Sequence, residues 1–237
     1  MLDCKRVLIK ISGEALSGDN NHGIDFTFVD RLSSIIKECY DLNKEIAIVV
    51  GGGNFWRGIQ NGKTDMDRTR SDHMGMLATT MNSLALASCL EQIGVPVKVQ
   101  SAIDMHRIAD PYIRANAISH LENKKVVIFA CGTGNPYFST DTGAVLRAAE
   151  INADIILLAK NIDGIYNCDP KTNSNAIKYE KITYKEILEK QLRVLDLTAT
   201  SLALDNKIPI LVFGIKNPDN IYKVICGEKL GTIVSHE

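Results

Sequence analysis

The sequence has no long apolar segment, no excess of charge of either sign and few aromatic residues. Its longest apolar runs, such as Ile155–Ala159 and Ile208–Phe213, are far shorter than the roughly 20 residues that cross a bilayer as a helix. The 27 Lys and Arg residues nearly balance the 28 Asp and Glu residues, so no global field attracts nucleic acid or an acidic membrane. The first residues, MLDCKRVLIKISG, lack the apolar core of a signal peptide. We therefore expect a cytoplasmic protein that binds neither membrane nor nucleic acid.

Cysteine and histidine are sparse and scattered. The six cysteines form no CxxC pair and several lie within apolar runs, which favours reduced, small core residues. The five histidines show no metal-ligand spacing, so we expect no zinc site and no metal ion held by protein side chains alone. No linker-like stretch divides the 237 residues, and we expect a single domain over 1–237.

Short apolar runs alternate with helical patterns along the whole chain. We predict strands at Arg6–Ile11, Glu45–Val50, Val97–Gln100, Val126–Cys131, Ala153–Ala159, Ile208–Phe213 and, at a sheet edge, Thr232–Val234. We predict helices at Phe28–Leu42, Arg68–Ile93, Ile113–Leu121, Ala144–Glu150, Thr183–Lys190, Thr198–Asn206 and Asn217–Cys226. The polar stretch Ser17–Gly23 reads as a surface loop. This alternation predicts an α/β fold, a three-layer αβα sandwich with a mostly parallel central sheet.

The middle of the chain, Val126–Glu150, has the features of an anion site. Its buried strand breaks at Gly132–Pro136, and the hydroxyl-rich residues Ser139–Thr142 precede a helix. Backbone N–H groups and the positive end of the helix dipole would then point to one place. An ordinary βα turn with a Ser or Asp N-cap would have the same residues.

Two more strand ends carry residues suited to phosphate. Lys10 precedes the small-residue turn Ser12-Gly13-Glu14, and Gly51–Gly53 follows a buried strand, with Arg57 one helical turn further on. Three consecutive glycines indicate that other atoms approach the backbone closely, and we expect a ligand there. The alternatives are a solvated strand-end lysine and a plain turn.

A fourth polar turn, Lys160–Asp169, follows the strand Ala153–Ala159. Its Tyr166 can stack on a purine or pack on the sheet edge. Asp72 starts a helix whose Met- and Ala-rich face can be core or a subunit interface. Because ligands of such sheets bind at the carboxyl ends of the strands, these turns together predict a nucleotide or phosphate site. A dehydrogenase fingerprint is excluded, since Tyr137 stands where the third glycine would be needed.

Five segments together resemble the bacterial UMP kinases, a branch of the amino acid kinase superfamily. The likeness covers essentially the whole chain in the same order, and SDHMGM and GTGNPYFSTDT are its most specific parts. The segments are Lys10–Leu16, Gly51–Asn54 with Arg57-Gly58, Ser71–Met76, Gly132–Thr142 and Lys160–Pro170.

The resemblance implies ATP-dependent phosphorylation of UMP to UDP, with Mg²⁺ accompanying ATP. The implied catalytic residues are Lys10, Arg57, Asp141 and Asp196. The implied ATP-binding residues are Lys10, Ile11, Ser12, Gly13, Gly53, Arg57, Asn161, Tyr166 and Asp169. The implied UMP-binding residues are Gly52, Asp72, Thr133, Gly134, Asn135, Pro136, Tyr137, Phe138, Ser139 and Thr140.

The resemblance also implies a homohexamer, with GTP as an activator acting through Gly18–Gly23 and UTP as an inhibitor. Two other functions stay open at this point. One is a related kinase that phosphorylates a carboxylate or carbamate, and the other is a nucleotide-binding regulator without catalysis. The first would share Lys10 and GGGN but not SDHMGM.

Overall fold

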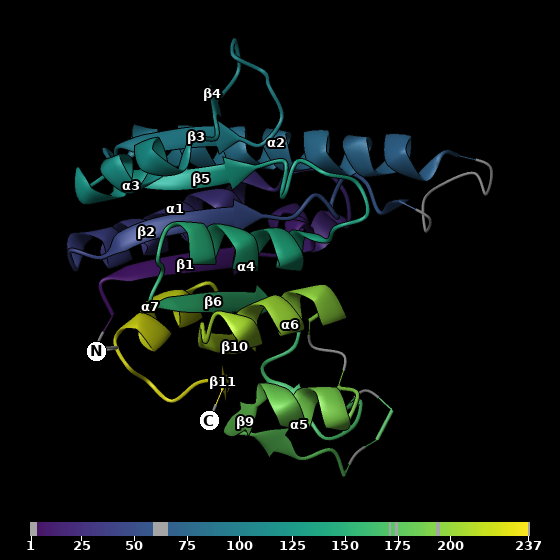
Figure 1. Cartoon of the computed structure of the whole chain (residues 1–237). Helices are drawn as coiled ribbons and strands as arrows, with labels where there is room; N and C mark the ends of the chain where they lie inside the picture. Colours follow the sequence, from purple (N-terminus) through teal and green to yellow (C-terminus); the bar gives the residue numbers. More distant parts are fainter. Residues whose placement is uncertain (1–3, 59–65, 171, 174, 193–194, 237) are drawn as a thin grey trace.

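The computed structural model describes residues 4–58, 66–170, 172–173, 175–192 and 195–236. Nine strands form the central sheet in the order β4-β3-β5-β2-β1-β6-β10-β11-β9 (Figure 1). Within it β10 and β11 are antiparallel, whereas the other described pairs are parallel. The strands are β1 (Arg6–Ile11), β2 (Glu45–Val50), β3 (Val97–Ser101), β4 (Asp110–Pro111), β5 (Val126–Ala130), β6 (Ile155–Lys160), β9 (Lys181–Thr183), β10 (Ile210–Gly214) and β11 (Thr232–Ser235).

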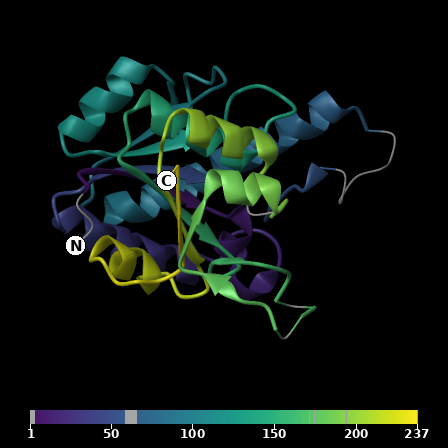
Figure 2. The same cartoon turned by 60° about the horizontal axis from the view of Figure 1, so that its bottom comes forward.

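Helices cover both faces of this sheet, as Figures 1 and 2 show. One apolar cluster packs α1 (Phe26–Asp41), α2 (Arg68–Gln92) and α7 (Asp219–Ile225) on one face. A second cluster packs the other face against α3 (Arg114–Glu122), α4 (Thr140–Glu150), α5 (Tyr184–Glu189) and α6 (Leu197–Asp205). A 3-10 helix, η1 (Gly13–Asn20), follows β1, and the hairpin β7 (Ile165–Tyr166) and β8 (Lys178–Tyr179) forms a separate two-stranded sheet.

The pleat of β1 decides where its lysine points. Successive side chains of a strand face opposite sides of the sheet. Val7, Ile9 and Ile11 join the cluster under α1 and α2, whereas Leu8 joins the cluster under α4. Lys10 shares the face of Leu8, so it lies on the side that α4 covers.

The predicted fold class is confirmed, with each predicted helix and strand found to within a few residues. α4 begins at Thr140, four residues before the predicted start, because the Ser139 hydroxyl caps it by accepting from Thr142 N at 3.1 Å. Thr183 and Glu186 form a capping box at the start of α5.

Two predictions about local structure were wrong. Thr232–Val234 is not an edge strand, because β11 pairs with β10 on one side and with β9 on the other. Within the predicted loop, Ser17–Asn20 belong to η1, and the buried Ser17 hydroxyl donates to Glu14 O at 2.8 Å. The prediction of free core cysteines is confirmed for Cys39, Cys89 and Cys131, whereas Cys4, Cys168 and Cys226 are free but half-buried. Within the described ranges no helix has both the length and the apolar composition to span a membrane.

Candidate active site

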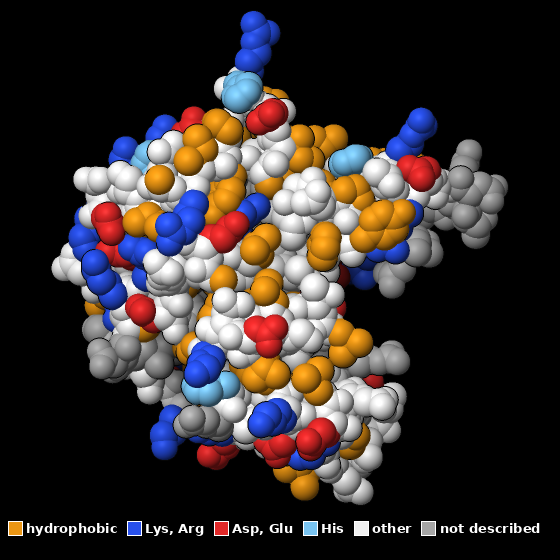
Figure 3. Space-filling model, in the orientation of Figure 1, with side chains coloured by type: hydrophobic (Ala, Val, Ile, Leu, Met, Phe, Trp, Pro, Cys, Tyr) orange, Lys and Arg blue, Asp and Glu red, His pale blue; other side chains and the backbone are white. Residues whose placement is uncertain are grey.

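A cavity of about 850 Å³ opens where the parallel strands end. Figure 3 shows the surface hollowed at the right, between the amino-terminal part of α2 above and α5 below. Many of the predicted site residues line this cavity: Gly52, Gly53, Arg57, Asp72, Thr133, Asn135, Tyr137, Phe138, Ser139, Thr140 and Asp196. Four parts of the chain therefore meet at one place: the turn after β2, the start of α2, the β5–α4 loop and the start of α6.

The other predicted site residues do not line this main cavity. Asp141 lines a neighbouring hollow of about 570 Å³, which it shares with Lys160 and with Asp196. Asp196 lines both hollows and so marks their boundary. The remaining predicted residues line neither of these two hollows: Lys10, Ile11, Ser12, Gly13, Gly134, Pro136, Asn161, Tyr166 and Asp169.

A cluster of three charged side chains lies where β1, β6 and α4 meet. Lys10 Nζ lies 2.7 Å from Asp141 Oδ1, and Lys160 Nζ lies 3.0 Å from Asp141 Oδ2. Burial raises the pKa of Asp141, but the charges of Lys10 and Lys160 lower it more, so the net pKa lies below the ordinary value of 3.8. Asp141 is therefore a carboxylate at neutral pH, with two ammonium groups around it.

The glycine run after β2 packs tightly against the protein itself. A Cβ at Gly13 would lie 2.7 Å from Gly53 N, and one at Gly52 would lie 2.7 Å from Gly75 O of α2. Real Cβ atoms do not come so close to backbone, so the chain needs glycine at both positions. The close approach predicted for this run is present, and its partners here are protein atoms. Gly52 and Gly53 also line the main cavity.

Glu14 joins the two turns that were predicted to hold ATP. Its Oε1 lies 2.8 Å from Arg57 Nη2, and its Oε2 accepts from Asn161 Nδ2 at 3.0 Å. Arg57 also donates from Nε to Gly53 O at 3.3 Å. Arg57 is thus held beside Gly53 by a carboxylate and a carbonyl while staying exposed. Its guanidinium can then reach an anion in the cavity.

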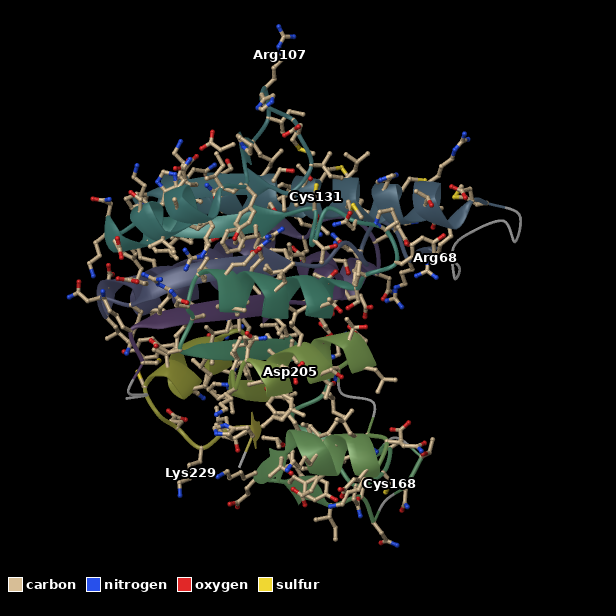
Figure 4. The ribbon with its side chains drawn as sticks, viewed as in Figure 1. Arg68, Arg107, Cys131, Cys168, Asp205 and Lys229 are labelled. Atoms are coloured by element: carbon tan, nitrogen blue, oxygen red, sulfur yellow. The ribbon has the colours of Figure 1, made fainter. Side chains whose placement is uncertain are left out.

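Asp72 already has two protein partners. Arg68, at the start of α2 (Figure 4), donates from Nε to both carboxylate oxygens, at 3.2 and 3.0 Å. The backbone N–H of Tyr137 donates to Asp72 Oδ2 at 2.8 Å. The guanidinium of Arg68 also lies 5.2 Å from the centre of the Tyr137 ring. These contacts tie the β5–α4 loop to α2 across the mouth of the cavity.

The β5–α4 loop and Asp196 are held by hydroxyl groups. Thr142 Oγ1 donates to Asp196 Oδ1 at 3.0 Å, and the Ser139 hydroxyl also donates to Asp196. Asp196 caps α6 by accepting from Ala199 N at 2.9 Å. The amino-terminal ends of α4 and α6 therefore meet at this carboxylate. Two helix dipoles direct positive potential to that corner of the cavity.

Tyr166 and Asp169 lie apart from the main cavity. The Tyr166 hydroxyl donates to Asp163 Oδ1 at 2.7 Å, and Lys178 Nζ lies 2.9 Å from Asp163 Oδ2. This hydrogen bond favours the neutral phenol and raises the pKa of Tyr166. Asp169 is exposed, and its carbonyl accepts from Thr172 N and Asn173 N in a turn.

Glu14, Trp56, Arg68 and Lys160 contribute to the site but were not among the single residues to which the sequence argument gave a role; Glu14 and Lys160 stood only within predicted turns. Lys160 ends β6 as Lys10 nearly ends β1, so the same strand-end reasoning could have found it. Trp56, the single tryptophan, lines the cavity and donates from Nε1 to Ser71 Oγ at 3.0 Å. Arg68 and Asp72 are four residues apart in α2, a spacing at which side chains of a helix can pair. The sequence could therefore have predicted this ion pair.

A parallel α/β sheet with lysines, an arginine and glycine turns at its carboxyl ends defines a phosphate-binding protein of the nucleotide-handling class. A model of the amino acid kinase family matches residues 5–214, and the chain belongs to that family. Three solved structures that it resembles are those of UMP or uridylate kinases.

The UMP kinase from Bacillus anthracis is 37% identical, with a TM-score of 0.95, over 99% of this chain and 97% of that one. The UMP kinase from Ureaplasma parvum is 42% identical, with a TM-score of 0.93, over 99% of this chain and 100% of that one. The uridylate kinase from Archaeoglobus fulgidus is 27% identical, with a TM-score of 0.74, over 97% and 99% of the two chains.

Proposed function

We propose that this protein is a UMP kinase that transfers the terminal phosphoryl group of ATP to UMP, giving ADP and UDP reversibly. The observation that carries the proposal is full-length similarity, at 37% and 42% identity, to two proteins that are named UMP kinases. The Lys10–Asp141–Lys160 cluster supports the proposal on chemical grounds, because Asp141 and Lys160 line the hollow next to the main cavity.

The acceptor would occupy the main cavity. Gly52, Asp72 and the eight residues Thr133–Thr140 would bind UMP, with Asp72 directed to the ribose hydroxyls. The donor would lie across Lys10–Gly13, Gly53 and Arg57, with its base towards Asn161, Tyr166 and Asp169. We propose one kinase domain for the whole of 1–237.

The transfer needs no general base. A nucleoside monophosphate has a second pKa of about 6, so it is an anionic nucleophile near neutral pH. One of its phosphate oxygens forms a bond to the terminal phosphorus of ATP while the bond to the bridging oxygen breaks. ADP leaves with that electron pair. Catalysis then depends on in-line positioning and on positive charge around a loose transition state. Lys10 and Arg57 would supply that charge, and Asp141 and Asp196 would hold the lysines and helix ends around it.

The donor set fits Mg²⁺ that arrives with ATP. Mg²⁺ prefers oxygen ligands and binds through one or two carboxylates plus substrate phosphates. Asp141 and Asp196 are the acidic side chains that line the smaller hollow, and among the described residues no three His, Cys, Asp or Glu side chains form a cage. When bound with ATP, the ion neutralises charge on the phosphates. Asp196, directly or through water, is the residue we assign to hold it.

We further propose a homo-oligomer, as a hexamer, in the cytoplasm. α2 exposes Met74, Leu77, Met81 and Leu84 along one helical stripe, which a second copy can cover. GTP as an activator and UTP as an inhibitor complete the proposed partners. Nucleic acid is not among them, since the formal net charge is -1.

The test is product formation from ATP with UMP, CMP, dUMP, aspartate and acetylglutamate in parallel. The proposal requires UDP from UMP at a rate well above that for the other acceptors. Turnover of aspartate or acetylglutamate instead would assign the chain to another activity of its family. ATP binding by calorimetry with no turnover of any acceptor would favour a regulator.

A further inference from the structure

Two asparagine side chains form a buried pair behind the glycine run. Asn82 is 0% exposed in the middle of α2, and Asn54, at 2% exposed, follows the glycines. Asn82 Nδ2 donates to Asn54 Oδ1 at 2.7 Å, and Asn54 Nδ2 donates back to Asn82 Oδ1 at 2.9 Å. The two amides are therefore reciprocal partners across 28 residues of sequence.

Each amide uses its second N–H on a different backbone segment. Asn82 Nδ2 donates to Gly51 O at 2.7 Å, and Asn54 Nδ2 donates to Gly23 O at 2.7 Å. Gly23 N in turn donates to Asn54 O at 3.1 Å. One buried pair thus joins α2, the glycine run and the segment after η1, and its four N–H groups all have acceptors.

The joined segments are those that bind the two substrates under the proposed function. α2 carries Asp72, ten residues before Asn82, on the acceptor side. The glycine run supplies Gly52 and Gly53, which line the cavity, and its Gly51 N–H is held by Ile11 O at 2.9 Å on the donor side. The position of α2 relative to this loop therefore sets the distance between the acceptor substrate and the donor substrate.

We propose that Asn82 is a positioning residue that fixes the Gly51–Asn54 loop against α2, so that the two substrates of the proposed kinase reaction are held in line. The expected effect on substrate alignment rests on the proposed function. The fixing of the loop rests only on the hydrogen bonds of Asn82. Asn82 touches no reacting atom, and it acts through the Gly51 carbonyl and the Asn54 amide.

A matched control is the next residue of the same helix. Ser83 is also 0% exposed, but its hydroxyl donates to Thr79 O within α2 at 2.8 Å and so holds no other segment. Ser83→Ala removes a buried polar group from the same turn of the helix without touching the loop. A difference between the two variants isolates the contact between α2 and the loop from general loss of a buried hydrogen bond.

The first measurement is independent of catalysis. Hydrogen–deuterium exchange follows the amides of Phe55 and Trp56, which donate to Gly52 O, and that of Gly23, which donates to Asn54 O. In Asn82→Leu we expect these amides to exchange about tenfold faster or more, because the loop opens locally without global unfolding. In Ser83→Ala they keep the exchange rates of the wild type.

The second measurement is steady-state kinetics with ATP and UMP. In Asn82→Leu we expect kcat to fall by about 100-fold, the scale of a misplacement of about 1 Å between reacting groups. The KM values for both substrates stay within about threefold, since the residues that contact them remain. If Asn82→Leu does not accumulate as folded protein, Asn82→Asp serves, because it keeps the shape and an acceptor but has no N–H for Gly51 O.

The outcomes separate the two proposals. Unchanged exchange at Gly23, Phe55 and Trp56 in the Asn82 variants overturns the inference whatever the activity. Faster exchange with unchanged kcat, or an equal loss of kcat in Ser83→Ala, also overturns it and leaves UMP kinase activity standing. If the wild type forms no UDP, the proposed function fails, and the exchange experiment alone then shows whether Asn82 holds the loop.

Discussion

Lys10 Nζ of β1 lies 2.7 Å from Asp141 Oδ1 of α4, and the other oxygen of the same carboxylate holds Lys160 of β6 at 3.0 Å. One carboxylate therefore keeps two ammonium groups close together at the carboxyl ends of adjacent strands. Without it the two positive charges would repel each other in a partly buried place. Under the proposed function the phosphates of ATP would meet this preformed positive cluster.

The first prediction concerns the charge of Lys10. Lys10→Ala should lower kcat by about 10²–10³, the scale for loss of one donor that stabilises a transition state. The KM for UMP should change little, because Lys10 lies outside the acceptor cavity. Steady-state kinetics measures both, and Lys5→Ala, which removes an exposed lysine paired with Glu45, is the control. Unchanged turnover in Lys10→Ala would leave this lysine with a structural role only.

The second prediction concerns stability and pH. Asp141→Asn leaves two lysines without their carboxylate, and removal of one partner of a buried ion pair costs about 3–5 kcal/mol. The folded-state pKa of Asp141 lies below its ordinary value of 3.8, so between these values the unfolded state binds more protons. Its stabilising contribution is thus complete above pH 3.8 and is lost as the pH falls through the folded-state pKa.

Urea unfolding at pH 7, 5, 4 and 3 tests this. The difference between the wild type and Asp141→Asn should stay constant from pH 7 to 5 and shrink towards pH 3. Asp41→Asn, which breaks the exposed i, i+4 pair with Lys37, should cost no more than about 0.5 kcal/mol. A difference that grows in acid would contradict the lowered pKa.

The layers and the parallel sheet could be predicted because runs such as Val126–Ala130 are apolar on both faces and alternate with helical patterns. The short strands β4, β7 and β8 have two residues each and β9 has three, too few for a period to be visible. Because β9 was not predicted, β11 was wrongly predicted to be the edge strand of the sheet.

The turns of the site could be predicted one by one, since Lys10 lies near the end of a buried strand and Gly51–Gly53 and Gly132–Pro136 each follow one. Their contacts with one another could not, because they depend on side chains far apart in sequence. Asn82 lies within a helical pattern and gives no signal until Asn54 is seen opposite it. Likewise, the sequence predicted that Gly52 is approached closely but not that Gly75 of α2 approaches it.

The third prediction concerns Tyr166, whose ring can stack on a purine or merely pack on the hairpin. If it stacks on the base of ATP, Tyr166→Ala should raise the KM for ATP about tenfold, since such stacking is worth about 1–3 kcal/mol. Tyr166→Phe keeps the ring and should change the KM for ATP by less than about threefold, although it loses the bond to Asp163. Kinetics at saturating UMP measures both. Equal KM values in all three proteins would favour simple packing.

The fourth prediction concerns the exposed stripe of α2. If a second copy covers it, light scattering should give a mass well above the 26.1 kDa of one chain. Leu77→Glu with Met81→Glu should lower that mass, because it puts charge into an apolar contact. Ile177→Glu, at another exposed apolar residue, should not. A monodisperse monomer for the wild type at micromolar concentration would contradict an interface on this face.

The last prediction is that Asp72 reads the sugar of the acceptor. Its carboxylate accepts from Arg68 on both oxygens and from Tyr137 N on Oδ2. A carboxylate has about four acceptor sites, so one remains, on Oδ1, for a sugar hydroxyl. Asp72→Asn should raise the KM for UMP about tenfold or more, since a hydrogen bond to a charged group contributes about 1.5–3 kcal/mol. The KM for ATP should stay unchanged, and the preference for UMP over dUMP should shrink if the 2′-hydroxyl is a partner. Asp67→Ala, which removes the N-cap of the same helix, should lower stability but change neither KM. No change for either nucleotide in Asp72→Asn would confine this carboxylate to holding Arg68 and the Tyr137 loop.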